Sequence, residues 1–138
     1  MAIGWVLWMT LRPDSTVDDT NLVPFRDHAW AIRCLLSDCS GITDAVYSIV
    51  VDVLGNVVVF FPIGLSLAGV LGGLPYRRRL ATAIAIGAAL SISIELIQLT
   101  IPSRATDVDD VLFNTTGTAL GATFLIVAQH RRRRNGEW

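Results

Sequence analysis

The sequence contains no lysine and is poor in charge of either sign. Only 17% of its 138 residues are charged, against about 25% in an average soluble domain, and 52% are hydrophobic. Mean hydropathy is +0.53. All eleven cations are therefore arginines, and seven of them form two clusters beside apolar segments. Membrane topology explains such clusters better than contact with nucleic acid, so we expect a membrane protein with no nucleic-acid partner.

The N-terminal apolar segment, residues 1–11, lacks the features of a signal peptide. It has no basic n-region and no A-x-A cleavage site. It is also too short to cross about 30 Å of hydrocarbon, which takes about 20 helical residues. We interpret it as part of a shortened first span whose true start lies upstream; the alternative is a segment that is only embedded in the membrane.

Three longer apolar segments are predicted to cross the membrane as helices. They cover residues 45–74, 80–101 and 107–130. If they alternate in direction, the arginines at 77–79 and 131–134 fall on one side, which the positive-inside rule assigns to the cytoplasm. The sequence thus predicts an all-α integral membrane helical bundle, a single domain in a cell membrane, with a cytoplasmic tail at 131–138.

The polar loop at residues 12–44 is predicted to lie on the opposite, extracytoplasmic side. It holds three arginines and six aspartates, a net charge of −3. After Pro24, apolar residues follow near-helical spacing and predict a short helix in the membrane interface: Phe25, Ala29, Trp30, Ile32, Leu35 and Leu36. Cys34 and Cys39 would form a local disulfide in an oxidising compartment, or they are two small half-buried apolar residues. His28 is interpreted as a polar loop residue.

Polar residues in the three spans share helix faces and meet at one depth. Asp52 and Asn56 are four apart, as are Gly87, Ser91 and Glu95, with Gln98 three further on. In the last segment, Asp110, Asn114, Gly117 and Gly121 share a face that ends in a pair of small residues, Gly117 and Gly121. At about 1.5 Å per residue, the polar side chains of all three segments lie within about 10 Å of the outer surface. Charge at such depth costs roughly 2.5–3.5 kcal/mol on insertion scales, so these residues are candidates for function. The candidate ligand-binding residues are Asp52, Asn56, Glu95, Gln98, Arg104, Asp107, Asp110 and Asn114.

Each of these residues also has a purely structural interpretation. Asp107 would cap the last helix, and Asp109 and Asp110 would be stabilised by its dipole. Arg104 would be their counter-charge. Gln98 and Asn114 would form hydrogen bonds between helices, at about 0.6–1 kcal/mol each.

The polar residues lie in motifs that resemble the VanZ-like family. The motifs are NLVPF at 21–25, D-x3-N-x3-F-x-P-x-G from Asp52, E-x2-Q from Glu95, and R-x2-D-x-D-D-x3-N-x2-G-x3-G from Arg104. The shortened first span departs from the family pattern. The resemblance implies a small multi-pass bacterial membrane protein of the cell envelope, in a family named for a member that confers low-level resistance to the antibiotic teicoplanin. It carries no catalytic role for any residue.

Three functions stay open at this point. In the first, the protein is not an enzyme, and its outer-leaflet pocket binds a lipid, lipid-linked or lipoglycopeptide head group without a cofactor. In the second, the polar residues only lock the helices, and function depends on a second copy or another membrane protein. In the third, Asp52, Glu95, Asp107 and Asp110 hold a divalent cation in an intramembrane enzyme acting on a lipid phosphate or ester. No Ser/His or Cys/His nucleophile pair is apparent in the sequence, which disfavours the enzyme.

Overall fold

The computed structural model describes residues 23–37, 41–101 and 107–136, and in these ranges the regular elements are all helices. They are α2 (Arg26–Ser37), α3 (Ile42–Ile49), the π-helix η1 (Val50–Leu54), α4 (Gly55–Val70), α5 (Tyr76–Gln98) and α6 (Val108–Asn135). Three helices are long and apolar enough to cross a membrane: Val50–Val70, Tyr76–Gln98 and Val108–Asn135. The prediction of an all-α membrane bundle with three clear spans is confirmed. The predicted short span at 1–11 lies outside the described residues.

The first described span continues an uninterrupted helix that begins before it. Val50 and Gly55, which follow α3 and η1, both keep right-handed helical backbone angles, so the helix runs from residue 42 to residue 70. At 1.5 Å per residue this is about 43 Å. The π-helix in its middle contains Asp52 and was not predicted. Such segments are rare and often occur at functional sites.

The helix boundaries differ from the prediction at the two arginine clusters. The arginines at 77–79 do not form a turn, because α5 already begins at Tyr76 and the connection is made by residues 71–75. Helix α6 runs through the second cluster to Asn135, and Gly136 ends it with a left-handed φ of 71°. Arginine is a good helix former, so both clusters extend the helices beyond their apolar segments. The cations at the C-terminal end of α6 are also stabilised by the dipole of that helix.

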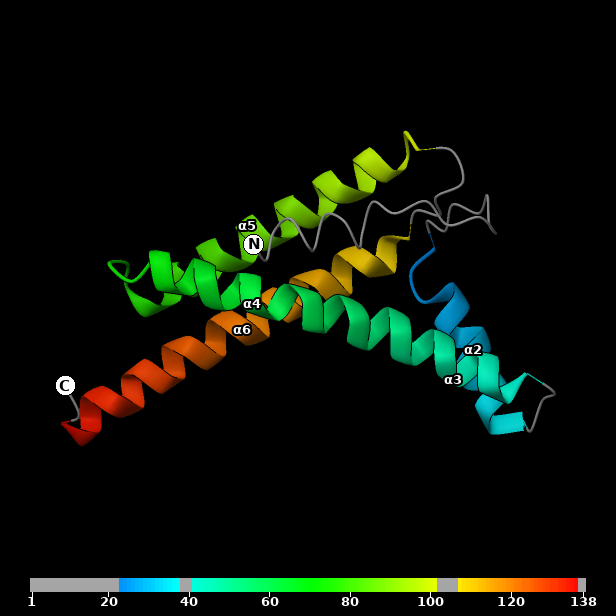
Figure 1. Cartoon of the computed structure of the whole chain (residues 1–138), viewed down its shortest axis with the longest axis horizontal. Coiled ribbons are helices and arrows are strands. Elements are labelled where there is room, and N and C mark those ends of the chain that lie inside the picture. Colours follow the sequence, from blue (N-terminus) through cyan, green and yellow to red (C-terminus); the bar gives the residue numbers. More distant parts are fainter. Residues whose placement is uncertain (1–22, 38–40, 102–106, 137–138) are drawn as a thin grey trace.

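Helix α6 lies at the centre of the bundle and crosses α4 (Figure 1). Glycines allow the two backbones to touch at this crossing. A Cβ atom added at Gly117 would collide with the carbonyl oxygen of Val57, one at Gly121 with that of Phe61, and one at Gly64 with the backbone of Thr118. The pair of small residues predicted on this face of α6 is therefore the contact surface with α4.

The bundle buries few large apolar side chains and exposes many. The buried apolar side chains of the three spans are mostly small, apart from Phe60, Ile94 and Ile126. In contrast, Val58, Leu96 and Phe124 are 65%, 59% and 61% exposed. Exposed apolar area on this scale is typical of a surface covered by lipid.

The short helix predicted after Pro24 is α2, which packs against α3. Ala31 and Cys34 are buried there against Ile49, while Leu35 and Leu36 are exposed. A position in the membrane interface stays a prediction. Cys34 carries no free thiol; its predicted partner Cys39 lies outside the described residues, so the pairing also stays a prediction.

Replacing a glycine at the crossing tests this packing. Gly121→Ala should destabilise the protein by about 1–3 kcal/mol, because the added methyl group forces the backbones of α4 and α6 apart. Gly55→Ala is the matched control: nothing lies within 4 Å of its added Cβ, so stability should be unchanged or rise by up to about 1 kcal/mol. Unfolding titrations in detergent, followed by circular dichroism, measure both. Equal stability of the two variants would contradict the proposed close contact.

Candidate functional site

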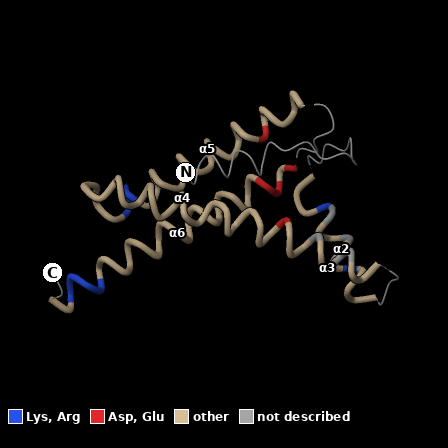
Figure 2. The backbone as a smooth tube through the Cα atoms, viewed as in Figure 1, with Lys and Arg blue, Asp and Glu red and all other residues tan. Residues whose placement is uncertain are grey.

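The candidate residues that the structure describes lie on η1, α4 and α5 and at the start of α6, which meet at one end of the bundle. Figure 2 shows the acidic residues of η1, α5 and α6 gathered there, while the arginine clusters of α5 and α6 lie at the other end. We call these the acidic end and the arginine end. The polar layer is the set of candidate residues at the acidic end that the structure describes, together with Asp109 and His28, which lie beside them: Asp52, Asn56, Glu95, Gln98, Asp107, Asp110 and Asn114.

Asp109 is the most deeply buried carboxylate of the polar layer, with 1% exposure. Both of its carboxylate oxygens accept from the backbone N–H of Phe25 at 2.9 Å, and Oδ2 lies 3.1 Å from His28 Nδ1. Phe113, on the next turn of α6, contacts the rings of Phe25 and His28, with centroids 6.5 Å and 5.2 Å away. Asp109 and Phe113 therefore fasten the start of α2 to the start of α6.

The backbone of Phe25 has a geometry that is unusual for a residue with a side chain. Its φ is +61°, in the left-handed region, which costs an L-residue roughly 1–2 kcal/mol. In this conformation its N–H reaches the Asp109 carboxylate. A charged acceptor strengthens a hydrogen bond to about 1.5–3 kcal/mol, enough to hold the strained turn.

The interpretation of His28 as a polar loop residue was wrong. His28 lies in α2, is 6% exposed, and is paired with Asp109. Its Nε2 atom is buried and has no hydrogen-bond partner among the described residues. The two partners are 81 positions apart, so no local spacing in the sequence signals the pair.

Two further side-chain hydrogen bonds join α6 to the neighbouring spans. Asn56 Nδ2 donates to Asp110 Oδ1 at 2.5 Å, and Asn114 Nδ2 donates to Ser91 Oγ at 2.9 Å. Ser91 was placed on the polar face of α5 but not among the candidate site residues. Asn114 is 2% exposed, and its Oδ1 atom has no partner in the described part of the chain.

Asp107 has the structural role that was the alternative to ligand binding. It is the N-cap of α6, and its side chain accepts from the backbone N–H of Asp109 at 2.9 Å. This bond satisfies one of the N–H groups that the first turn of a helix leaves open.

The polar face predicted on α5 is buried. Ser91, Glu95 and Gln98 are 0%, 7% and 2% exposed, and Gly87 contacts Thr118 of α6 so closely that an added Cβ would lie 2.5 Å from its side chain. Asp52 is half-buried in η1, which also contacts α6. A buried carboxylate at Glu95 thus belongs to the interior of the bundle and does not face lipid.

Two parts of the predicted site have no geometric support in the structure. Arg104 lies outside the described residues, so its pairing with the aspartates stays a prediction. Among the described residues, no group of three or more histidine, cysteine, aspartate or glutamate side chains is arranged to hold a metal ion. The cation site suggested for Asp52, Glu95, Asp107 and Asp110 therefore stays a prediction without geometric support in the described residues.

Removing the Asp109 carboxylate should release α2 from the bundle. In Asp109→Ala, Phe25 and His28 lose a charged acceptor that contributes about 1.5–3 kcal/mol per hydrogen bond, so amide exchange in α2 should accelerate more than tenfold. Hydrogen exchange with mass spectrometry measures this directly. Thr116→Ala is the control on the exposed face of α6, where the hydroxyl bonds only to Leu112 of its own helix. Unchanged exchange in α2 of Asp109→Ala would refute the fastening role.

The chain is similar to a known protein family. The family model described as VanZ/LLP1 matches residues 1–129. No curated protein and no solved structure matches the chain. The match covers all of the described polar layer, the first two described spans and the third span up to residue 129, which agrees with the motifs in the sequence. The chain is a multi-pass membrane protein that belongs to the VanZ/LLP1 family.

Proposed function

We propose that this protein binds the polar head group of a lipid, a lipid-linked molecule or a lipoglycopeptide in the polar layer, without chemical conversion. The proposal rests on one observation. Buried polar groups from several helices meet at the acidic end, and some of their donor or acceptor atoms have no hydrogen-bond partner among the described residues. The Oδ1 atom of Asn114 and the Nε2 atom of His28 are both buried without a partner in the described structure.

Buried polar atoms without hydrogen bonds, such as these two, lower the stability of a fold. A buried polar atom that makes no hydrogen bond destabilises a protein by about 1–3 kcal/mol. A span that only had to pack could place an apolar residue at either position. Their presence supports a partner that is supplied from outside the chain, which is the usual role of polar residues within membrane spans.

The chemistry of these groups indicates what the ligand offers. Asn114 Oδ1 is an acceptor and calls for a hydroxyl or amine donor. The Nδ1 atom of His28 bonds to Asp109, which leaves Nε2 to accept from a hydroxyl or, when the ring is protonated, to donate to a phosphate or carboxylate. Arg104, near in sequence, would pair with the same anionic group. Sugars and phosphates of lipid-linked head groups supply both kinds of atom.

A structural role of the same residues is the second candidate, and specific bonds favour it. The Asn56–Asp110 and Asn114–Ser91 hydrogen bonds join α6 to α4 and α5. Such bonds stabilise membrane bundles by about 0.6 kcal/mol on average. If the layer has only this role, its variants change stability and leave ligand binding unaffected.

Glu95→Gln separates these two functions because it removes a charge and keeps the side-chain shape. Nanodiscs of phosphatidylcholine that contain a polyprenyl phosphate, and teicoplanin added in solution, are the two probes. If Glu95 helps to orient the head-group site, affinity for at least one probe should fall about tenfold, the loss of one charge-assisted hydrogen bond. Ser93→Ala, on the exposed face of α5, should bind like the wild type.

The outcomes of this experiment are distinct. Loss of binding with wild-type unfolding behaviour supports the head-group site. Lower stability with unchanged binding supports the structural role, and in that case cells with enough protein keep their phenotype. No binding of either probe by the wild type would refute the head-group proposal as stated.

We further propose that the protein lies in a bacterial cell membrane with the arginine end in the cytoplasm. Seven arginines at one end, on α5 and the end of α6, support this orientation through the positive-inside rule. A fluorescent protein that matures only in the cytoplasm, fused after Trp138, should fluoresce. If this fusion does not fluoresce and a fusion of alkaline phosphatase at the same position is active, the orientation is the opposite one. The polar layer would then lie on the cytoplasmic side.

A further inference from the structure

Arg79 differs from the other arginines of the first cluster because it is buried. Arg77 and Arg78 are exposed, whereas Arg79 is 7% exposed. Its Nε atom donates to the carbonyl of Ala68 on α4 at 2.6 Å, and Nη1 donates to Gln129 Oε1 on α6 at 2.9 Å. Membrane topology explains a cluster of exposed arginines but does not require one of them to enter the bundle.

The guanidinium of Arg79 retains one donor group without a partner. Its Nη2 atom is buried and makes no hydrogen bond to any described residue. A buried guanidinium is costly unless its donors are paired. Two of its nitrogens are already bonded within the chain, so the third is left to bind an acceptor that the described residues do not supply.

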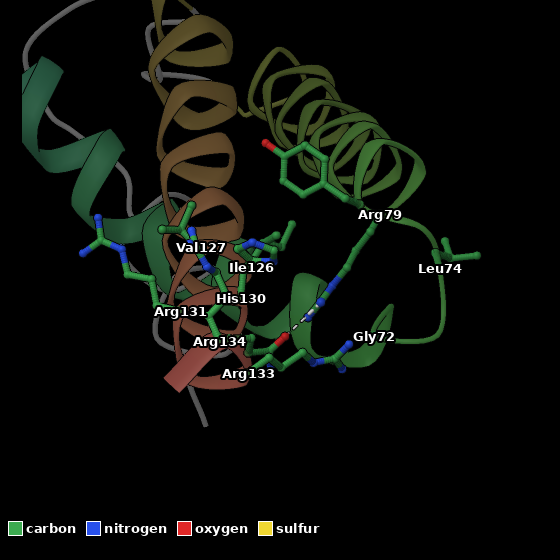
Figure 3. A pocket seen from close by; sticks show the side chains of 11 residues that line it. Gly72, Leu74, Arg79, Ile126, Val127, His130, Arg131, Arg133 and Arg134 are labelled. Carbon is green, nitrogen blue, oxygen red and sulfur yellow. Dashed lines mark hydrogen bonds between the residues drawn. The ribbon is translucent and has the colours of Figure 1, made fainter. Parts of the chain in front are cut away.

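A cavity of about 480 Å³ lies beside this arginine, between α5 and the end of α6. Figure 3 shows Arg79 reaching from α5 toward α6, where the dashed line marks its bond to Gln129. Three more arginines line the cavity, and none of the eleven described lining residues is acidic. The cavity is therefore a concentrated site of positive charge.

The cavity wall is not uniformly polar. Leu74, Ile126 and Val127 also line it. It lies where the apolar part of α6 gives way to the arginines, which is the level of the lipid head groups in a membrane that the spans cross. An apolar wall beside arginines suits a phosphate that carries acyl chains better than a free phosphate ion.

We propose that this cavity is a binding site for the phosphate of an anionic phospholipid from the leaflet at the arginine end. The phosphate oxygens accept from Arg79 Nη2 and from the arginines on α6, and the start of the acyl chains covers the apolar wall. Arginine suits this role because its planar group donates to a phosphate while other nitrogens stay bonded to protein. The site shares no residue with the polar layer, so the two proposals fail or stand independently.

The test compares arginines that line the cavity with arginines that do not. The full chain is placed in nanodiscs of phosphatidylcholine with phosphatidylglycerol, and retained lipid is measured by native mass spectrometry after release into detergent. The wild type should retain phosphatidylglycerol in preference to phosphatidylcholine. Arg131→Gln with Arg134→Gln removes two lining charges and should reduce retention about 25-fold, at about fivefold per arginine.

The control removes the same number of charges, one from each arginine cluster. Arg78→Gln with Arg132→Gln deletes two exposed arginines that do not line the cavity, and retention should stay close to that of the wild type. Equal losses in the two double variants would overturn the proposal, because they would indicate diffuse attraction to the surface. Absence of any preference for phosphatidylglycerol would also overturn it.

Two more measurements test the role of Arg79 and whether a lipid or a soluble phosphate occupies the cavity. Arg79→Lys keeps the charge but removes the planar donor group, so retention should fall while circular dichroism shows unchanged helix content; unchanged retention would overturn the role of Nη2. Inorganic phosphate and glycerol phosphate, added at millimolar concentration, should not displace the lipid. Displacement by either would overturn the lipid as occupant and assign the site to a soluble phosphate.

Discussion

The backbone contact between α4 and α6 is the constraint on which the rest of the structure depends. Three positions, Gly64, Gly117 and Gly121, allow the two helices to touch where any side chain would separate them. In a membrane, apolar side chains gain little by leaving lipid, so close van der Waals contact and hydrogen bonds hold helices together. The crossing supplies the contact, and it leaves the two ends of the bundle to be held by polar side chains.

Those polar side chains work in the same way at both ends. At the acidic end, Asp109 holds α2, while Asp110 and Asn114 bond to α4 and α5. At the arginine end, Arg79 of α5 bonds to Ala68 of α4 and to Gln129 of α6. Helix α6 takes part in hydrogen bonds at both ends of the bundle, which explains why its first turn and its last apolar turn both carry polar residues. Between the two ends, contacts are made mainly by glycine, alanine and a few larger apolar side chains.

The sequence predicted the features that depend on local pattern. Helical period and segment length gave the three spans, and four-residue spacing gave the buried face from Gly87 to Gln98 and the contact glycines of α6. It could not predict the π-helix at Asp52 or the burial of His28 and Arg79, since each depends on what a distant segment presents. The His28–Asp109 pair spans 81 positions and the Arg79–Gln129 pair 50. An arginine cluster looks the same in sequence whether one member is buried or none is.

Both candidate sites are inferred from buried polar atoms that lack a hydrogen-bond partner among the described residues. A bundle held by polar side chains is most stable when every buried donor and acceptor is paired, and most of the polar atoms at both ends are. Exceptions in described, buried positions include Asn114 Oδ1 and His28 Nε2 at the acidic end and Arg79 Nη2 at the arginine end. If these atoms were only packing defects, there would be no reason for each to lie among other charged or polar side chains at the level of one membrane surface. The proposed ligand at each surface would complete the pairing, and its binding would add to the stability of a fold that has little apolar core.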